Sequence, residues 1–294
     1  MRARPLVPNV AVPRGDHGAV QRGAVRRGAA AGWVFLLLVV TAVLAQTDAK
    51  PATAPREPER PTAGTMVVVQ VECANSVAPG AGEMPPGRGR PPEAFAAALP
   101  NLVRYLAKVP GLELPVQVSR GPLDGRAVAG AGLLYWTGCA GLPPLSEAEK
   151  RGLGRYLVAG GLLFADDIRA STPEYGLDGT DAGVAGTPFD RQFKALIADP
   201  LVLGAAGGQW EPVPVNHAVY HSFFDFPDGP PRGGAPSGKT LSLEMLQVRG
   251  RPAIIFSDLN LSWYWGDPFA GTRERGLQFG VNLLVLARSQ QLKP

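Results

Sequence analysis

Several side chains that could carry out acid–base or metal chemistry stand directly after predicted β-strands. Asp166 and Asp167 follow the strand predicted over 162–165, and Asp258 follows the one over 253–257. In open α/β sheets the ligand crevice lies beyond the carboxyl ends of the strands, so these three carboxylates are candidate catalytic residues. Candidate ligand-binding residues at the same edge are Cys139, Asp190, His217 and His221. Carboxylates with two histidines would suit a divalent metal ion or an acid/base pair, and the sequence identifies no cofactor.

The carboxylates also have a structural interpretation. An aspartate after a strand is frequently the N-cap of the next helix, and neighbouring like charges can simply be solvated. If Asp166 and Asp167 face each other, their repulsion requires a cation or a shared proton to relieve it. Both interpretations stay open at this point.

The two C-terminal histidines are four residues apart, a spacing that would put them on one face of a helix. Pro212 and Pro214 before them and Pro227 after them favour a loop instead. The pair His217 and His221 also lacks the glutamate of the HExxH zinc motif. We therefore expect these histidines to cap or pack local structure.

Aromatic residues gather in two segments, 223–226 and 263–265. Exposed rings would stack on sugars or contact partner proteins, whereas buried rings would fill an irregular core. We expect the phenylalanines of 223–226 to belong to the core, and Trp263 is a candidate ligand-binding residue. No GxSxG, phosphate-loop or GxGxxG motif follows a strand, so serine hydrolases, nucleotide hydrolases and dinucleotide-binding proteins lack support.

The elements that must position these residues alternate between strand and helix. Apolar runs predict strands over 66–71, 114–118, 132–137 and 162–165, the second of them an edge strand because it contains a proline. Apolar residues spaced at intervals of four and three predict an amphipathic helix over 95–109, in which Pro100 must kink the helix or lie in its first turn. Ser146 and Glu149 form a capping box that starts a further helix.

The pattern changes towards the C-terminus. We predict a short helix over 188–198, an antiparallel hairpin of strands 241–248 and 253–257, and a last helix over 272–288. Alternating strands and helices with short connections require right-handed crossovers and a parallel sheet covered on both sides. The predicted fold is α/β, a flavodoxin-like three-layer sandwich with a mainly parallel sheet and an antiparallel hairpin near the C-terminus.

The N-terminal region has the pattern of a targeting segment. Residues 1–45 contain six arginines and one aspartate, and an apolar run over 33–44 is followed by Ala45, after which cleavage is expected. This order predicts an export signal, with an uncleaved membrane anchor over 28–45 as the alternative. Residues 46–64 are proline-rich and predict an extended linker before a domain over 65–290. We expect the protein in the periplasm or at the outer face of the inner membrane.

Composition and charge argue against several classes of protein. The chain has 294 residues, of which 45% are hydrophobic and 18% charged, enough apolar material for a real core. The formal net charge is +4, but the residues after the leader carry one net negative charge, so electrostatics gives no reason to expect nucleic-acid binding. The only two cysteines, Cys73 and Cys139, follow strands that become neighbours in the flavodoxin-like order 2-1-3-4. They could form a disulfide after export or remain separate thiols.

The segments GLLYWTGCAGLPPLSEAEKRGLGRYLVAGGLLFADD, FDRQFKAL, HAVYHSFFDF and GRPAIIFSDLNLSWYWGDP resemble the bacterial domain-of-unknown-function family DUF4159 over about residues 66–287. That family in turn resembles the class I glutamine amidotransferase-like superfamily, whose members are flavodoxin-like. The resemblance implies a fold and no particular activity.

Two departures from the resemblance bear on function. Where the family commonly has TGH after the third strand, this chain has Thr137, Gly138 and Cys139. Where amidotransferases place a nucleophilic cysteine, it has Asp166 and Asp167, and a carboxylate cannot replace the thiolate. We therefore expect non-catalytic binding or envelope assembly, with envelope proteins or a small-molecule or glycan ligand as partner. The alternative is a hydrolase, for example of glycans, that uses the aspartates.

Overall fold

The computed structural model describes residues 64–72, 92–138, 142–167, 188–231, 243–268 and 273–292. The chain divides into two compact units, Met1–Arg56 and Glu57–Pro294, and every described residue belongs to the second. The predicted export signal over 1–45 and nearly all of the predicted linker over 46–64 therefore lie outside the described residues. No helix within the described ranges is long and apolar enough to cross a membrane.

The described part is an α/β domain built on a seven-stranded mixed sheet in the order β2-β1-β3-β4-β7-β6-β5. The first five strands of this order run parallel, and β6 and β5 add antiparallel pairings at one side. The strands are β1 (Met66–Val71), β2 (Val116–Gly121), β3 (Leu133–Gly138), β4 (Leu162–Asp167), β5 (Glu211–Pro212), β6 (Glu244–Val248) and β7 (Arg251–Ser257).

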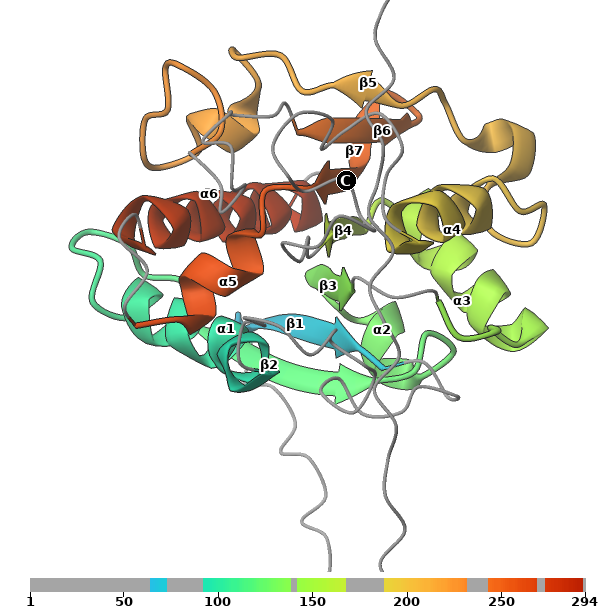
Figure 1. Ribbon diagram of the computed structural model, residues 1–294, viewed down its shortest axis with the longest axis horizontal. Helices are drawn as coiled ribbons and strands as arrows, with labels where there is room; N and C mark the ends of the chain where they lie inside the picture. Colours follow the sequence, from blue (N-terminus) through green and yellow to red (C-terminus); the bar gives the residue numbers. More distant parts are fainter. Residues whose placement is uncertain are drawn as a thin grey trace, which may run out of the picture. The chain divides into compact units, whose positions relative to one another are not determined.

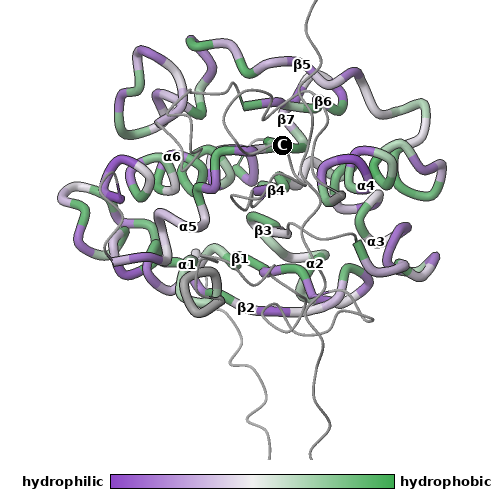
Figure 2. The backbone as a smooth tube through the Cα atoms, viewed as in Figure 1, coloured by the Kyte–Doolittle hydropathy of each residue, from purple (hydrophilic) through white to green (hydrophobic). Residues whose placement is uncertain are grey.

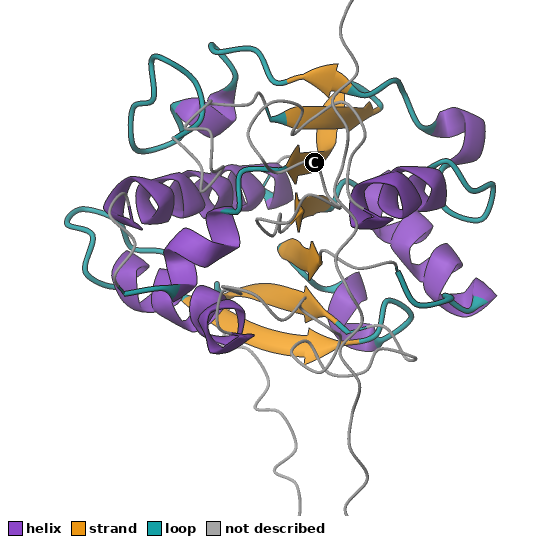
Figure 3. Cartoon of the chain, viewed as in Figure 1, coloured by secondary structure: helices purple, strands orange, loops and turns teal. Residues whose placement is uncertain are grey.

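The described ranges contain six α-helices, and Figure 1 shows α1, α5 and α6 on one side of the strands and α2, α3 and α4 on the other. Their bounds are α1 (Pro92–Leu106), α2 (Arg126–Ala129), α3 (Glu147–Val158), α4 (Pro188–Ile197), α5 (Leu261–Gly266) and α6 (Arg273–Gln291). The described residues 198–231, between α4 and β6, are mostly loop (Figure 3) and include the 3-10 helices η2 (Gly204–Ala206) and η3 (Ala218–Tyr220).

The central strands are apolar because both of their faces are buried. Val68 and Val69 of β1 are fully buried, yet they belong to different apolar clusters on opposite faces of the sheet. Successive side chains of a strand point to opposite faces, so each strand contributes to both clusters. Figure 2 shows the central strand β3 as largely hydrophobic, whereas the edge strand β2 contains hydrophilic stretches. This difference agrees with the predicted edge position of β2.

Helix α3 has the best-defined start in the described chain. The Ser146 hydroxyl accepts the backbone N–H of Glu149, and the Glu149 carboxylate accepts the N–H of Ser146, which confirms the predicted capping box. After the helix, Gly160 has φ +97°, a left-handed conformation that side chains other than glycine rarely adopt. Strand β4 then starts at Leu162.

The predicted strands and long helices are all present, with shifted bounds. The hairpin is confirmed as β6 and β7, joined through Arg249 and Gly250, both at positive φ. Pro100 lies inside α1, well past its first turn, so of the two predicted alternatives the first-turn position is wrong. A different proline, Pro92, begins the helix, where the missing N–H costs nothing. Helix α2, helix α5 and strand β5 were not predicted because each is shorter than a periodic pattern can reveal.

Candidate functional site

Asp166 is a fully buried carboxylate of the predicted set and lies near the end of β4. One of its carboxyl oxygens accepts the backbone N–H of Ser262 at 2.7 Å, and the other accepts that of Leu261 at 3.3 Å. Both amides belong to the first turn of α5, and the preceding Asn260 turns the chain there with φ +55°. Asp166 therefore caps the start of α5 from a strand that lies far away in the sequence.

Burial sets the protonation preference of this group. It raises the pKa of Asp166 above its ordinary value, and hydrogen bonds from Ser262, Ser257 and the α5 backbone only partly oppose it. Burial likewise raises the pKa of Tyr135, whose hydroxyl interacts with Ser262 and senses the charge of Asp166. Asp166, Tyr135, Ser257 and Ser262 form a polar cluster between β3, the ends of β4 and β7, and α5. All four side chains are buried from solvent.

The two neighbouring aspartates do not face each other. Strand β4 continues through both, so Asp166 points to the face of α5 and α6 while Asp167 points to the face of α3 and α4. The sequence-based prediction assumed that the strand ends at Ala165, so that the two carboxylates could face each other and would need a cation to relieve their repulsion. The longer strand removes this assumption. Asp167 is also fully buried, and Asp258, just past β7, is half-buried.

Asp190 belongs to an ion-pair network on the opposite face. It lies on α4, 3.0 Å from the ammonium of Lys194, which also contacts Glu244 of β6 at 2.6 Å. The ammonium lies 4.9 Å from the centre of the Phe256 ring and 5.5 Å from that of Trp210. Burial alone would lower the pKa of Lys194, but the hydrogen bonds with Glu244 and Asp190 outweigh it and raise the pKa. Lys194 thus links α4 to strand β6 through Glu244, and Asp190 pairs with Lys194 from within the same helix.

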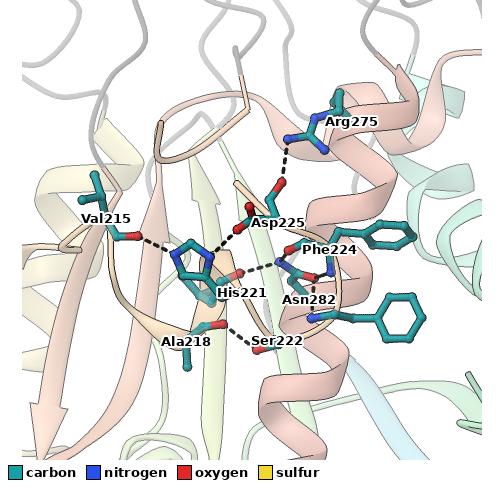
Figure 4. A network of polar contacts seen from close by, with 10 residues as sticks. Val215, Ala218, His221, Ser222, Phe224, Asp225, Arg275 and Asn282 are labelled. Atoms are coloured by element: carbon teal, nitrogen blue, oxygen red, sulfur yellow. Dashed lines mark hydrogen bonds and ion pairs between the residues drawn. The ribbon is translucent and has the colours of Figure 1, made fainter. Parts of the chain in front are cut away.

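The two histidines flank η3 and make different contacts. His217 is the N-cap of η3, and its Nδ1 accepts the N–H of Val219 at 3.2 Å. Burial lowers the pKa of His217. His221 lies beyond η3, with Nδ1 2.6 Å from Asp225 Oδ1 and Nε2 2.8 Å from the carbonyl oxygen of Val215 (Figure 4). Both histidines make the local contacts that the sequence predicts.

Asn282 fastens the segment 213–231 to α6, and sequence reasoning missed it. Its Oδ1 accepts the N–H groups of Phe223 and Phe224 at 3.2 and 2.8 Å. Its Nδ2 donates to the carbonyls of Val219 and Phe224 at 3.0 and 2.8 Å (Figure 4). The signal was a single amide in the apolar run of α6, where a buried polar group must find partners.

The aromatic segments divide between core and surface. Phe226 is buried, whereas Phe223 is 40% exposed, so the expectation of a core role holds for only part of 223–226. Trp265 is buried, and its indole N–H donates to the Gly276 carbonyl at 2.7 Å. Trp263 of the same helix is half-buried.

The remaining expectations concern the two cysteines and a metal centre. Cys73 and Cys139 lie outside the described residues, although the strands before them, β1 and β3, are neighbours as expected. Among the described residues, no group of three or more His, Cys, Asp or Glu side chains could hold a metal ion.

Comparison with known proteins assigns the chain to a family. No curated protein matches the sequence significantly. The profile of the family described as Domain of unknown function (DUF4159) matches residues 87–287, more than half of the chain and most of the described α/β domain. The chain therefore belongs to the DUF4159 family.

Proposed function

We propose that this chain is an exported, non-catalytic binding or envelope-assembly protein on a flavodoxin-like, glutamine amidotransferase-like scaffold. Its partner would be an envelope protein or a glycan of the cell envelope. The observation that carries the non-catalytic part is the use of Asp166, whose two carboxyl oxygens accept backbone amides of α5 in a fully buried place. A general acid or base must reach the proton that it transfers, and a buried cap cannot.

Other candidate groups are also engaged in internal contacts. Asp190 pairs with Lys194, His217 caps η3, and both ring nitrogens of His221 lie beside oxygen atoms of the same segment. Such contacts support a scaffold in which polar side chains hold loops in place.

The strand order supports the scaffold assignment. The sequence β2-β1-β3-β4, with apolar clusters on both faces, agrees with the three-layer flavodoxin-like arrangement. At the strand end where an amidotransferase would carry its nucleophilic cysteine, β4 carries Asp166 and Asp167 instead. We therefore propose the amidotransferase-like fold without its activity.

Cell-wall binding and hydrolysis can be separated in one assay. The full chain, purified from an expressing bacterium, is incubated with isolated sacculi, and both its sedimentation and the release of soluble sugar are measured. Sedimentation without release supports the proposal. Release that disappears in a folded Asp258→Asn variant, but persists in a control variant of the exposed Asp228, Asp228→Asn, would establish a hydrolase. A chain that neither sediments nor releases sugar would exclude the cell wall and direct the test to envelope proteins by cross-linking in cells.

Export is tested separately. Residues 1–64 fused to a reporter that is active only outside the cytoplasm are expected to give an active reporter, because an Arg-rich stretch precedes a short apolar run. Replacing Leu36 and Leu38 by arginine should abolish the activity, since a charged run no longer enters the membrane. A fusion that stays silent and soluble in the cytoplasm would contradict export.

A further inference from the structure

The segment 213–231 closes on itself through one imidazole ring. The ring of His221 lies between Asp225 and Val215, with its two nitrogens 2.6 and 2.8 Å from a carboxylate oxygen and a carbonyl oxygen. Figure 4 shows the ring bridging these two positions of the segment. The contacts join one residue before η3 to one residue beyond it.

Both partner atoms can only accept hydrogen bonds. A neutral imidazole carries one N–H, so it can donate to the Val215 carbonyl or to the Asp225 carboxylate, but not to both. Its second nitrogen would then turn a lone pair towards an oxygen atom at hydrogen-bond distance. The doubly protonated ring of His221 donates to both oxygens and satisfies the whole arrangement.

We propose that His221 is a proton-operated latch, which in its imidazolium form ties Val215 to Asp225 and on losing one proton to solvent releases Val215. The charge-assisted hydrogen bond with Asp225 is the stronger of the two, so the remaining N–H stays with the carboxylate. The released part contains Val215, a residue that is already 58% exposed.

The far side of the segment does not move with the latch. Asn282 holds Phe223 and Phe224 on α6 through bonds that do not titrate. Arg275, also on α6, donates to the backbone carbonyl of Asp225 at 3.1 Å and stacks over the Phe226 ring at 3.8 Å. Opening is therefore confined to the part of the segment before η3.

The groups around the ring favour the protonated, closed form. The Val215 carbonyl, and then the Asp225 carboxylate, raise the pKa of His221 above its ordinary value. Among the described residues, the charged groups that these contacts place around the ring are Asp225 in the segment and Arg275 on α6. His217 plays the opposite role, because its Nδ1 accepts an N–H and burial lowers the pKa of His217.

The direction of the pH effect follows from the raised pKa. The stabilisation that the closed latch provides is complete below 6.5, the ordinary pKa of histidine, and is lost as the pH rises through the higher folded-state pKa of His221. Because the His221 side chain is 37% exposed and that of Asp225 is 73% exposed, salt weakens the latch. In the exported chain proposed above, the latch would respond to the acidity outside the cytoplasm. That use rests on the proposed location, whereas the latch itself does not.

NMR on the full chain tests the latch, with ¹⁵N-labelled histidine rings and ¹³C-labelled valine methyl groups. We expect His221 to titrate above 6.5 with both nitrogens protonated at low pH, and the Val215 methyl signals to shift with the same midpoint. Asp225→Asn should lower this midpoint by roughly one unit. His221→Gln should remove the Val215 titration, while the control His217→Asn, which can still cap η3, should leave it unchanged.

Two results would overturn the proposal. One is a His221 midpoint at or below 6.5 in the wild-type chain. The other is a set of Val215 methyl signals that stay constant while His221 titrates. Both readings come from the wild-type protein, so a variant that fails to fold does not affect them.

Discussion

Replacing Gly152 by alanine is expected to lower the melting temperature by roughly 5–10 °C, because the new methyl group has no space. Gly152 lies on the face of α3 that packs against the loop after β2, and a Cβ there would lie far inside the contact distance of the Leu123 carbonyl oxygen. It would also lie 2.9 Å from the carbonyl carbon of Leu123 and 3.0 Å from Asp124 Cα. These are backbone atoms, so a change of rotamer cannot relieve the overlap and α3 must shift, at a cost of about 1–3 kcal/mol or more.

The matched control is Gly130→Ala. Gly130 follows α2 at a negative φ, and a Cβ at this position meets no atom within 4 Å. Alanine there reduces the freedom of the unfolded chain and should leave the melting temperature unchanged or slightly raised. Thermal unfolding of the three proteins by circular dichroism gives the comparison. If Gly152→Ala has the same melting temperature as the wild type, the close contact between α3 and the loop is not required for stability.

Local signals explain what the sequence predicts well. The capping box of Ser146 and Glu149 needs only four consecutive residues, and the structure confirms it. The strands β1, β3 and β4 stand out because apolar runs of their length are uncommon outside a sheet that is buried on both faces. The hairpin of β6 and β7 follows from a short polar turn between two apolar runs.

The candidate site was harder to predict for two reasons. It depends on which face of the sheet each strand residue points to, and it depends on contacts between residues far apart in the sequence. Extending β4 by two residues brings Asp166 and Asp167 into the strand and sends them to opposite faces. The role of Asp166 then depends on α5, which lies about a hundred residues further along the chain and is too short to show a period. Asn282 likewise binds a segment about sixty residues away, and no local sequence pattern predicts such a contact.

Removing the Asp166 carboxylate is expected to destabilise the domain more than neutralising it. Alanine leaves the amides of Leu261 and Ser262 without acceptors in a place that solvent does not reach, at about 1–3 kcal/mol for each buried donor. Asparagine keeps the volume and one acceptor oxygen, but its NH₂ group faces the other amide. The melting temperatures should therefore fall from wild type to Asp166→Asn to Asp166→Ala.

Two controls make this order specific. The exposed Asp228, which lies outside the buried polar cluster, should tolerate alanine with little change. A chelator should leave all the midpoints where they are, because the backbone amides of α5, and not a cation, satisfy the carboxylate. An Asp166→Ala protein as stable as wild type would contradict the cap, and a midpoint lowered by chelator would restore the metal interpretation.

The raised pKa of Asp166 makes the stability of the fold depend on pH, and this contribution can be measured separately from those of other groups. A carboxyl whose folded-state pKa lies above its ordinary value of 3.8 stabilises the fold fully below 3.8, and this contribution is lost as the pH rises through the folded-state value. Asp166→Asn cannot titrate, so subtracting its stability from that of the wild type isolates the contribution of this carboxyl. We expect the free energy of unfolding of the wild type to rise relative to that of Asp166→Asn as the pH falls from 7 towards 4. Urea unfolding at each pH measures this difference. A difference that stays constant or shrinks would show that the amides of α5 hold Asp166 ionised despite its burial.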